Sequence, residues 1–181
     1  MVKRLARAFS WMTIAALLGG AVIYLYGQYR PEIPIPITEP LTGKVDRILV
    51  AKAARKMHVY REGELLKSYT IALGFTPVGD KAQEGDGKTP EGIFKINRRN
   101  DQSSYHLSLG IDYPQADDRA QARARGVSPG GDIFIHGQPN TLKGRATLTT
   151  DWTAGCIAVS DAEIEELFAA VDYGTVVEIT P

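Results

Sequence analysis

The sequence has one cysteine and only three histidines among its 181 residues, and its 21 basic residues balance 21 acidic ones. A single cysteine cannot form an internal disulfide, which excludes a small domain held together by disulfides. Residues 1–44 hold five basic and two acidic residues, which leaves sixteen basic against nineteen acidic residues in the remainder. A domain with this slight negative charge makes a poor nucleic-acid binder.

Since the single cysteine has no partner in its own chain, its thiol must be buried, paired between chains, or used for chemistry.

Residues 1–29 are predicted to form a membrane segment. Three basic residues precede an uncharged stretch from Ala8 to Tyr29, which is long enough to cross a bilayer as a helix. Positive charge before the apolar run keeps the N-terminus in the cytoplasm and sends the following chain across the membrane. The run ends in bulky residues instead of the small ones that mark a cleavage site. We therefore expect an uncleaved, single-pass anchor, with a cleaved signal segment as the alternative.

Residues 30–44 contain four prolines and no apolar periodicity, which indicates a stiff, extended linker. The remaining residues, 45–181, are numerous enough for one domain with its own core. From Arg47 to Asn97, short β-branched and aromatic runs alternate with turn residues, and another such run covers Thr175 to Ile179. These runs predict strands.

Two segments predict helices, and one long segment predicts a loop. Ser160 and Glu163 form a capping box that begins an amphipathic helix, and residues 117–125 are consistent with a short polar helix. Residues 74–92 are rich in glycine and form a long loop, which in a compact domain is usually functional or mobile. The sequence therefore predicts a mainly β domain with a short helix.

Cys156 and His136 are the predicted nucleophile and base. A thiol near neutral pH is largely protonated, so a catalytic cysteine needs a base nearby. In the strand from Asp132 to His136, the alternation of side chains points His136 away from the two isoleucines. Gly155 lets the chain turn before Cys156 and brings backbone amides close to a bound carbonyl, as an oxyanion hole requires. Gly137 leaves room beside the imidazole.

Two other interpretations compete with this one. Cys156 lies between Gly155 and Ile157, and a free cysteine often serves as a small buried hydrophobe. A zinc site could combine Cys156 with the histidines, but no two of these ligands have the close spacing that is common in zinc sites. We therefore expect no metal and no organic cofactor. The three histidines are His58, His106 and His136.

The His-Gly element followed by Gly-Cys resembles the L,D-transpeptidase catalytic domain family, also called the YkuD-type domain. The segments KMHVYREGELLKSYTIALG and GDGKTPEGIF resemble the opening strands and loop of that domain. The resemblance covers nearly all of residues 45–181. The GCIAVS form, followed by an acidic amphipathic helix, is similar to the YafK-like subgroup of the family.

This resemblance implies a β-sandwich-like fold and a substrate in the stem peptides of bacterial peptidoglycan. It implies that Cys156 attacks the stem's third residue, expels the terminal D-alanine and forms a thioester. His136 would take the thiol proton, the Gly137 carbonyl would orient the imidazole, and the amides of Gly155 and Cys156 would hold the oxyanion. The domain would then face the periplasm of a bacterium, with its anchor in the inner membrane.

The sequence departs from the family's commonest pattern, which has serine or threonine, histidine, glycine, cysteine, an aliphatic residue and arginine. Ala154 and Ala158 stand where that pattern has histidine and arginine. The two alanines leave the proposed nucleophile and base in place but remove two polar groups near the site, so they bear on which substrate binds. Other polar residues are candidates for binding the stem, and we name Thr153, Arg145, Asp151 and His106, with Lys88 and Thr89 on the glycine-rich loop as further possibilities.

Three functions stay open at this point. The first is transfer of the stem to an amine acceptor, and the second is hydrolysis of the same acyl-enzyme, either as a carboxypeptidase or as an amidase that releases wall-bound protein. The third is a wall-binding module without activity, suggested by Ala154 and Ala158. The sequence gives no indication of the oligomeric state.

Overall fold

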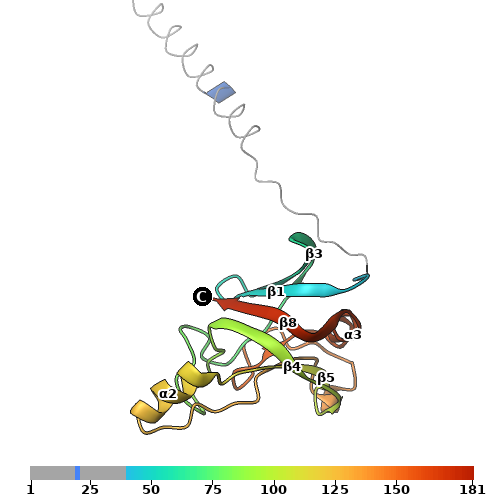
Figure 1. Ribbon diagram of the computed structural model, residues 1–181. Helices are drawn as coiled ribbons and strands as arrows, with labels where there is room; N and C mark the ends of the chain where they lie inside the picture. Colours follow the sequence, from blue (N-terminus) through green and yellow to red (C-terminus); the bar gives the residue numbers. More distant parts are fainter. Residues whose placement is uncertain (1–18, 21–39) are drawn as a thin grey trace, which may run out of the picture. The chain divides into compact units, whose positions relative to one another are not determined.

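The computed structural model describes residues 19–20 and 40–181 (Figure 1). Except for residues 19–20, the predicted membrane segment lies outside the described residues, as does most of the predicted linker. Within the described ranges, no helix is long and apolar enough to cross a bilayer. In chain order, the elements are β1 (Val45–Ala51), β2 (Lys56–Arg61), β3 (Glu64–Thr70), β4 (Gly92–Ser103), β5 (His106–Ile111), α2 (Ala116–Ala124), β6 (Phe134–His136), the 3₁₀ helix η1 (Asn140–Leu142), β7 (Ile157–Ala158), α3 (Asp161–Ala170) and β8 (Val171–Thr180).

All eight strands belong to one sheet, in the order β3-β2-β1-β8-β4-β5-β6-β7. The last strand, β8, lies between β1, which is parallel to it, and β4, which is antiparallel. The long strand β4 connects the two halves of the sheet, because its first residues pair with β8 and its later ones with β5. The register of β4 shifts between Ile96 and Arg98, where an irregularity interrupts its pairing with β5.

The sheet curls until its two edges meet. Just after β3, Ala72 exchanges two backbone hydrogen bonds with Ala158 of β7, at 2.9 and 2.8 Å. Gly74 forms a second bridge, to Thr153. The predicted mainly β fold is thus confirmed, with one continuous curled sheet around the core in place of a sandwich-like pair of layers. Both segments that the sequence predicts as helices are α-helices, α2 and α3. We call the junction at Ala72–Ala158 the seam.

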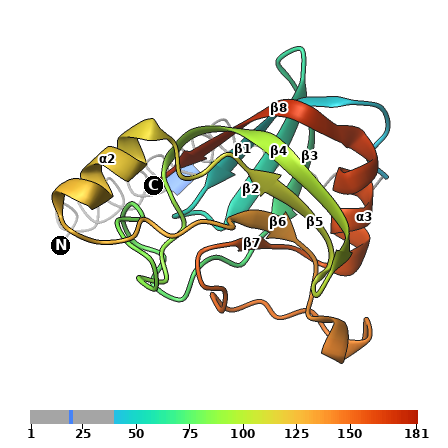
Figure 2. The same cartoon turned by 60° about the horizontal axis from the view of Figure 1, so that its bottom comes forward.

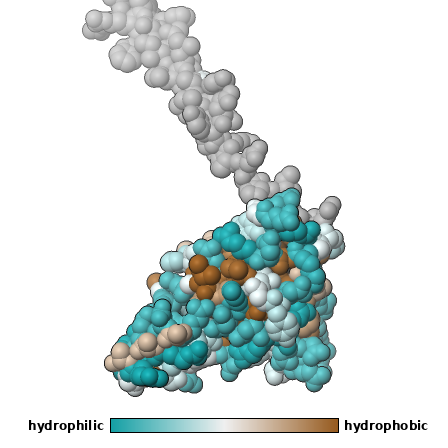
Figure 3. All heavy atoms as spheres, viewed as in Figure 1, coloured by the Kyte–Doolittle hydropathy of each residue, from teal (hydrophilic) through white to brown (hydrophobic). Residues whose placement is uncertain are grey.

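The apolar core fills the inside of this curled sheet. Alternate residues of the strands point inward, as in β1, where Ile48 and Val50 are fully buried. Helix α3 packs against β5, β6 and β8 (Figure 2). Its buried residues are Ile164, Leu167 and Ala170. In Figure 3 the surface is mainly hydrophilic, with an apolar patch in the region of β1, β8 and β4.

Helix α3 begins as predicted. Ser160 accepts a hydrogen bond from the Glu163 amide, and the Glu163 carboxylate accepts one from the Ser160 amide at 2.8 Å. This capping box satisfies two backbone donors that a helix start would otherwise leave unpaired. Since Ser160 follows β7 closely, the cap also fixes where the chain leaves the cysteine segment.

Candidate active site

Cys156 and His136 line one cavity of about 300 Å³. The cavity lies on β4, β5 and β6 and on the turn before β7. The other residues that line it are Asn100, Ser103, Ser104, Tyr105, Ser108, Asp132 and Phe134. The cavity thus contains a thiol, an imidazole, several hydroxyl groups and one carboxylate.

The register of the strands explains why these residues meet. Asn100 of β4 lies opposite Ser108 of β5, and Ser108 lies opposite His136 of β6. Side chains of directly paired residues lie on the same face of a sheet. His136 pairs in turn with Ala158 of β7, two residues after Cys156. The pairing of four strands therefore brings the thiol and a row of polar groups to the same face as the imidazole.

A backbone carbonyl holds the imidazole of His136. Its Nδ1 lies 2.7 Å from the carbonyl oxygen of Gly137. A carbonyl only accepts hydrogen bonds, so Nδ1 must carry the proton, and Nε2 is left as the basic nitrogen. The ring is 3 % exposed, and burial lowers the pKa of His136, although the bond to Gly137 raises it in part. The imidazole is therefore neutral and basic near pH 7.

Two aromatic side chains enclose the imidazole. The centroid of the Tyr105 ring lies 4.6 Å from that of His136, and the Trp152 ring lies at 5.6 Å, edge-on. Together they limit the rotation of the imidazole and keep water from much of its surface. The Trp152 Nε1 is the single buried side-chain nitrogen or oxygen of the described residues that lacks a hydrogen-bond partner.

The thiol of Cys156 is held between two backbone groups. Its Sγ donates to the carbonyl of Asp132 and accepts from the amide of Phe134, both at 3.4 Å. Asp132 adopts a positive φ of 56°. Burial raises the pKa of Cys156, the Phe134 amide lowers it, and the Asp132 carboxylate raises it further. The resting cysteine is therefore a protonated thiol and not a thiolate.

Thr153 organises the turn that presents the cysteine. Its Oγ1 donates to the Cys156 carbonyl at 2.7 Å and accepts from the Gly155 amide at 3.1 Å. Thr153 is buried, so its hydroxyl supports the turn from inside, whereas the sequence suggested that it binds substrate. The Gly155 amide, one of the two predicted oxyanion donors, donates to this hydroxyl.

The glycine-rich loop packs directly against this turn. Gly155 has a φ of 135°, and a Cβ at this position would lie 2.6 Å from the Lys88 carbonyl oxygen. The loop is fixed from below by Lys52, which is 2 % exposed. Its Nζ donates to the carbonyls of Gly79 and Thr89 at 2.7 and 2.9 Å, and to the Glu91 carboxylate at 2.8 Å. Hydrogen bonds from Lys52 thus hold the glycine-rich loop in place against the cysteine turn.

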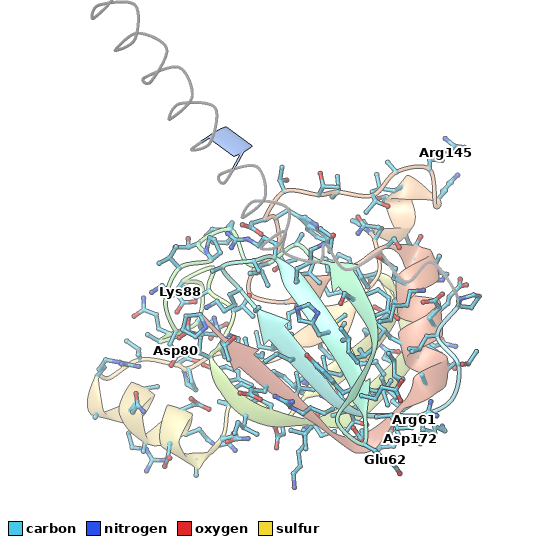
Figure 4. All side chains as sticks on the ribbon, turned by 90° about the horizontal axis from the view of Figure 1, so that it is seen from above. Arg61, Glu62, Asp80, Lys88, Arg145 and Asp172 are labelled. Atoms are coloured by element: carbon cyan, nitrogen blue, oxygen red, sulfur yellow. The ribbon has the colours of Figure 1, made fainter. Side chains whose placement is uncertain are left out.

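The remaining predicted binding residues lie outside the lining of the cavity. Asp151 forms an ion pair with Arg55 at 2.8 Å and accepts from the Leu73 amide, so it ties the cysteine segment to the chain after β3. The ring of His106 pairs with Glu165 of α3 at 2.7 Å. Arg145 is exposed, and Figure 4 shows it on the opposite side of the domain from Lys88.

Two further positions of the sequence analysis have defined places. Thr89, on the glycine-rich loop, is fully buried and its hydroxyl accepts from the Gly74 amide at 3.2 Å, so it supports the loop. Ala158, which stands where the family pattern has arginine, is 2 % exposed and part of the seam. Ala158 therefore supplies no cation to this site.

Sequence reasoning missed several residues around the cavity. Tyr105, Ser108 and Asn100 reach it only through the pairing of β4, β5 and β6, which no local pattern reveals. Trp152 was not among the predicted site residues either, although it lies four residues before Cys156. Among residues 19–20 and 40–181, no group of three or more His, Cys, Asp or Glu side chains lies close enough together to hold a metal ion.

Comparisons with known proteins give a consistent result. The L,D-transpeptidase catalytic domain (YkuD) matches residues 45–179. YafK of Escherichia coli (strain K12), whose name places it among the L,D-transpeptidases, is 28 % identical over 139 residues, which are 74 % of this chain and 50 % of that protein. The chain thus spans about half the length of this curated relative.

Two solved structures resemble the domain. The helical cell shape determining protein Pgp2 from Campylobacter jejuni has a TM-score of 0.58 and 30 % identity, over 76 % of this chain and 48 % of that one. Bd1075 of Bdellovibrio bacteriovorus has a TM-score of 0.53 and 25 % identity, over 78 % and 52 %. With the matched domain covering most of its residues, the chain belongs to the L,D-transpeptidase catalytic domain family.

Proposed function

We propose that this protein is a peptidoglycan acyltransferase that uses Cys156 as its nucleophile. The observation that carries the proposal is the pairing of this thiol, in one cavity, with an imidazole whose tautomer the Gly137 carbonyl fixes. A base with a free Nε2 beside a thiol is the arrangement that nucleophilic acyl transfer needs. The substrate would be a tetrapeptide stem, as membership of the family suggests.

In the first half of the reaction, Nε2 of His136 takes the proton of the thiol as Sγ attacks the carbonyl of the third stem residue. The Cys156 amide stabilises the oxyanion that forms. The tetrahedral intermediate then collapses, the bond from carbon to nitrogen breaks, and the imidazolium returns its proton to the leaving amine of D-alanine. A thioester between Cys156 and the stem remains.

In the second half, an amine acceptor attacks the thioester. The neutral imidazole takes a proton from the acceptor, a new amide forms, and the thiolate is reprotonated as it leaves. Water in place of the amine gives hydrolysis by the same steps. We propose the amine as the natural acceptor, and the product analysis described below decides between the two.

The resting state of this pair is neutral, which defines the kind of catalysis. Burial lowers the pKa of His136 and raises the pKa of Cys156, so a preformed thiolate–imidazolium pair is disfavoured. Proton transfer must therefore accompany the attack on the carbonyl, as general-base catalysis. Such a thiol reacts slowly with small alkylating agents and faster with ligands that occupy the cavity.

We further propose that the protein remodels the wall from the outer side of the inner membrane, held by residues 1–29. The charge pattern of that segment supports this orientation. The name of Pgp2, a helical cell shape determining protein, supports a role in cell shape. Protease added to spheroplasts should digest the domain of the membrane-bound protein, and protection of the domain would contradict this orientation.

The test of the activity uses the full-length protein in detergent with purified disaccharide tetrapeptide. Release of D-alanine, with a mass adduct of the acyl group on Cys156, is the expected result. Cross-linked or amine-exchanged products indicate transfer, and tripeptides alone indicate hydrolysis. Cys156→Ala should give neither adduct nor D-alanine while its thermal unfolding stays close to wild type. A folded wild-type protein that binds sacculi but releases no D-alanine would be a binding module, and the proposal would be wrong.

A further inference from the structure

The described lining of the cavity has no cationic side chain, although a tetrapeptide stem that ends in D-alanine carries a carboxylate next to the scissile bond. The described lining residues include one acid, Asp132, and no lysine or arginine. Ala158, where the family pattern has its arginine, lies buried in the seam. A carboxylate that enters this cavity would therefore meet Asp132 and no cation unless one is supplied from outside the lining.

Arg98 of β4 is a cation that lies next to the lining of the cavity. It lies opposite Gly110, which in turn lies opposite Phe134 of β6. Because Gly110 has no side chain, the guanidinium lies over the Phe134 ring, with Cζ 4.5 Å from the ring centroid. A Cβ on Gly110 would lie 2.9 Å from the Phe134 ring and 3.0 Å from Arg98. The strand register thus holds Arg98 beside a lining residue of the cavity.

The partner of Arg98 lies at the mouth of the cavity. The Arg98 Nη1 donates to the Asp132 carboxylate at 2.6 Å. The Asp132 side chain is 80 % exposed, and exposed ion pairs are weak because water screens them. The backbone carbonyl of the same residue accepts a hydrogen bond from the Cys156 thiol. Asp132 therefore contacts both Arg98, through its carboxylate, and the nucleophile, through its backbone.

The positive charges of Lys81 and Arg98 both lower the pKa of the Cys156 thiol, but Lys81 is not available for exchange. Lys81 is buried, and its Nζ binds the Asp86 carboxylate at 2.8 Å and the Gln83 carbonyl at 3.1 Å. Asp86 itself accepts hydrogen bonds from three loop amides. This pair belongs to the internal structure of the glycine-rich loop, whereas Arg98 is bound by one exposed acid.

We propose that Arg98 binds a carboxylate of the stem peptide beside the scissile bond and exchanges Asp132 for it. This inference rests on the proposed function, and it names the residue that selects the substrate. Asp132 then acts as a placeholder that holds the guanidinium over Phe134 in the empty site. The carboxylate can belong to the terminal D-alanine or, where the third residue is a diamino dicarboxylic acid, to the side chain of that residue, and both present the same chemistry to a guanidinium.

The test compares four substrates with the full-length protein: a tetrapeptide stem with both carboxylates free, two stems with one of them amidated, and one with both amidated. The variant Arg98→Gln should lower kcat/KM roughly ten- to hundredfold on the free stem, mainly through KM. It should have no effect on the stem whose bound carboxylate is amidated. The amidated stem on which wild type and variant coincide identifies which carboxylate Arg98 binds.

Asp132→Asn is the second variant, and it tests the exchange without removing Arg98. Asparagine tolerates the positive φ of this position and keeps the backbone carbonyl. Since it frees the guanidinium, it should lower KM for the free stem relative to KM for the doubly amidated stem, whatever its effect on the rate of the chemical step. Arg47→Gln is the matched control, because Arg47 also pairs with an acid, Glu178, and lies over an aromatic ring, Tyr60.

The outcomes separate this inference from the proposed function. If wild type releases no D-alanine from any stem, the function itself is wrong. If wild type is active and Arg98→Gln has the same kcat/KM ratio between free and amidated stems as Arg47→Gln, the function stands and the assignment of Arg98 is wrong. An equal loss on all four stems would mean that Arg98 acts only on the fold, which also overturns the inference.

Discussion

The hydroxyl of Thr153 donates a hydrogen bond to the carbonyl oxygen of Cys156 across 2.7 Å, and accepts one from the intervening Gly155. One side chain thus satisfies two backbone groups of the turn that carries the nucleophile. We expect Thr153→Val to lower the free energy of unfolding by about 1–3 kcal/mol, since it leaves both groups without a partner. Thermal and urea unfolding measure this.

Thr153→Ser serves as the control, because it keeps the hydroxyl and removes only a methyl group. It should retain most of the activity, whereas Thr153→Val should lose most of it through a misplaced thiol. Equal activity in the two variants would show that the hydroxyl does not position the cysteine.

We expect Gly155→Ala to be more harmful than a glycine substitution elsewhere. The added Cβ would lie 2.6 Å from the Lys88 carbonyl at a φ of 135°, so both the backbone and the loop must move. Gly63→Ala is the comparison, since Gly63 also has a positive φ but has nothing within 4 Å of the added Cβ. Gly63→Ala should cost about 1 kcal/mol. A cost for Gly155→Ala no larger than this in urea unfolding would contradict the close packing.

The acid side of the pH profile should reflect the buried imidazole. Burial lowers the pKa of His136, so the base stays neutral to a lower pH than an ordinary histidine. We expect kcat/KM to decline only below pH 6.5, roughly the ordinary pKa of histidine. The stability that comes from the neutral imidazole is present above this pH and is lost as the pH falls through the lowered pKa. A decline of kcat/KM centred above pH 7 would contradict this environment.

The pH dependence of thiol alkylation should be shifted to higher pH, opposite to the shift expected for the imidazole. Burial raises the pKa of Cys156, so the rate of reaction with iodoacetamide should reach its midpoint above about pH 8.5, the ordinary value. Because the Asp132 carboxylate also raises this pKa, Asp132→Asn should move the midpoint to lower pH. Stopped labelling followed by intact-mass measurement gives both curves, and an unmoved midpoint would mean that the carboxylate does not act on the thiol.

Lys52→Met should loosen the glycine-rich loop. The substitution removes three hydrogen bonds and leaves two carbonyls and Glu91 without their donor, at a cost of about 2–4 kcal/mol. Lys56→Met is the control, since the Lys56 amine is exposed and binds only the Thr70 hydroxyl. Limited proteolysis should cut the loop faster in Lys52→Met alone, and identical digestion of both variants would argue against an anchored loop.

Local patterns in the sequence were sufficient for some of these features. The strand at His136 and the capping box at Ser160 depend on a few neighbouring residues, and the structure has both. The strand is shorter than predicted, since it begins at Phe134 and Asp132 has a positive φ. The glycine-cysteine turn was also recognisable, because glycine permits the backbone conformation that Gly155 adopts. Such features are decided within one turn or strand.

Features that depend on distant pairing were not predictable. Ser108 and Asn100 lie beside His136 only because of the register of three strands, and the curled sheet depends on bridges between residues far apart in sequence. Asp151 and Thr153 were interpreted as substrate ligands because they are polar and close to Cys156, but the fold uses both side chains internally. Lys52 was missed because composition favours an exposed lysine over a fully buried one.

The seam between Ala72 and Ala158 has a consequence for the order in which the domain matures. Contacts between distant parts of a chain are slow to form, because a long loop must close before they repay its entropy. The cysteine turn adjoins this contact, because Thr153 bridges to Gly74, so a chain whose seam has not formed lacks this support of the turn. Acylation of Cys156 by a substrate-like reagent should therefore report that the sheet has closed.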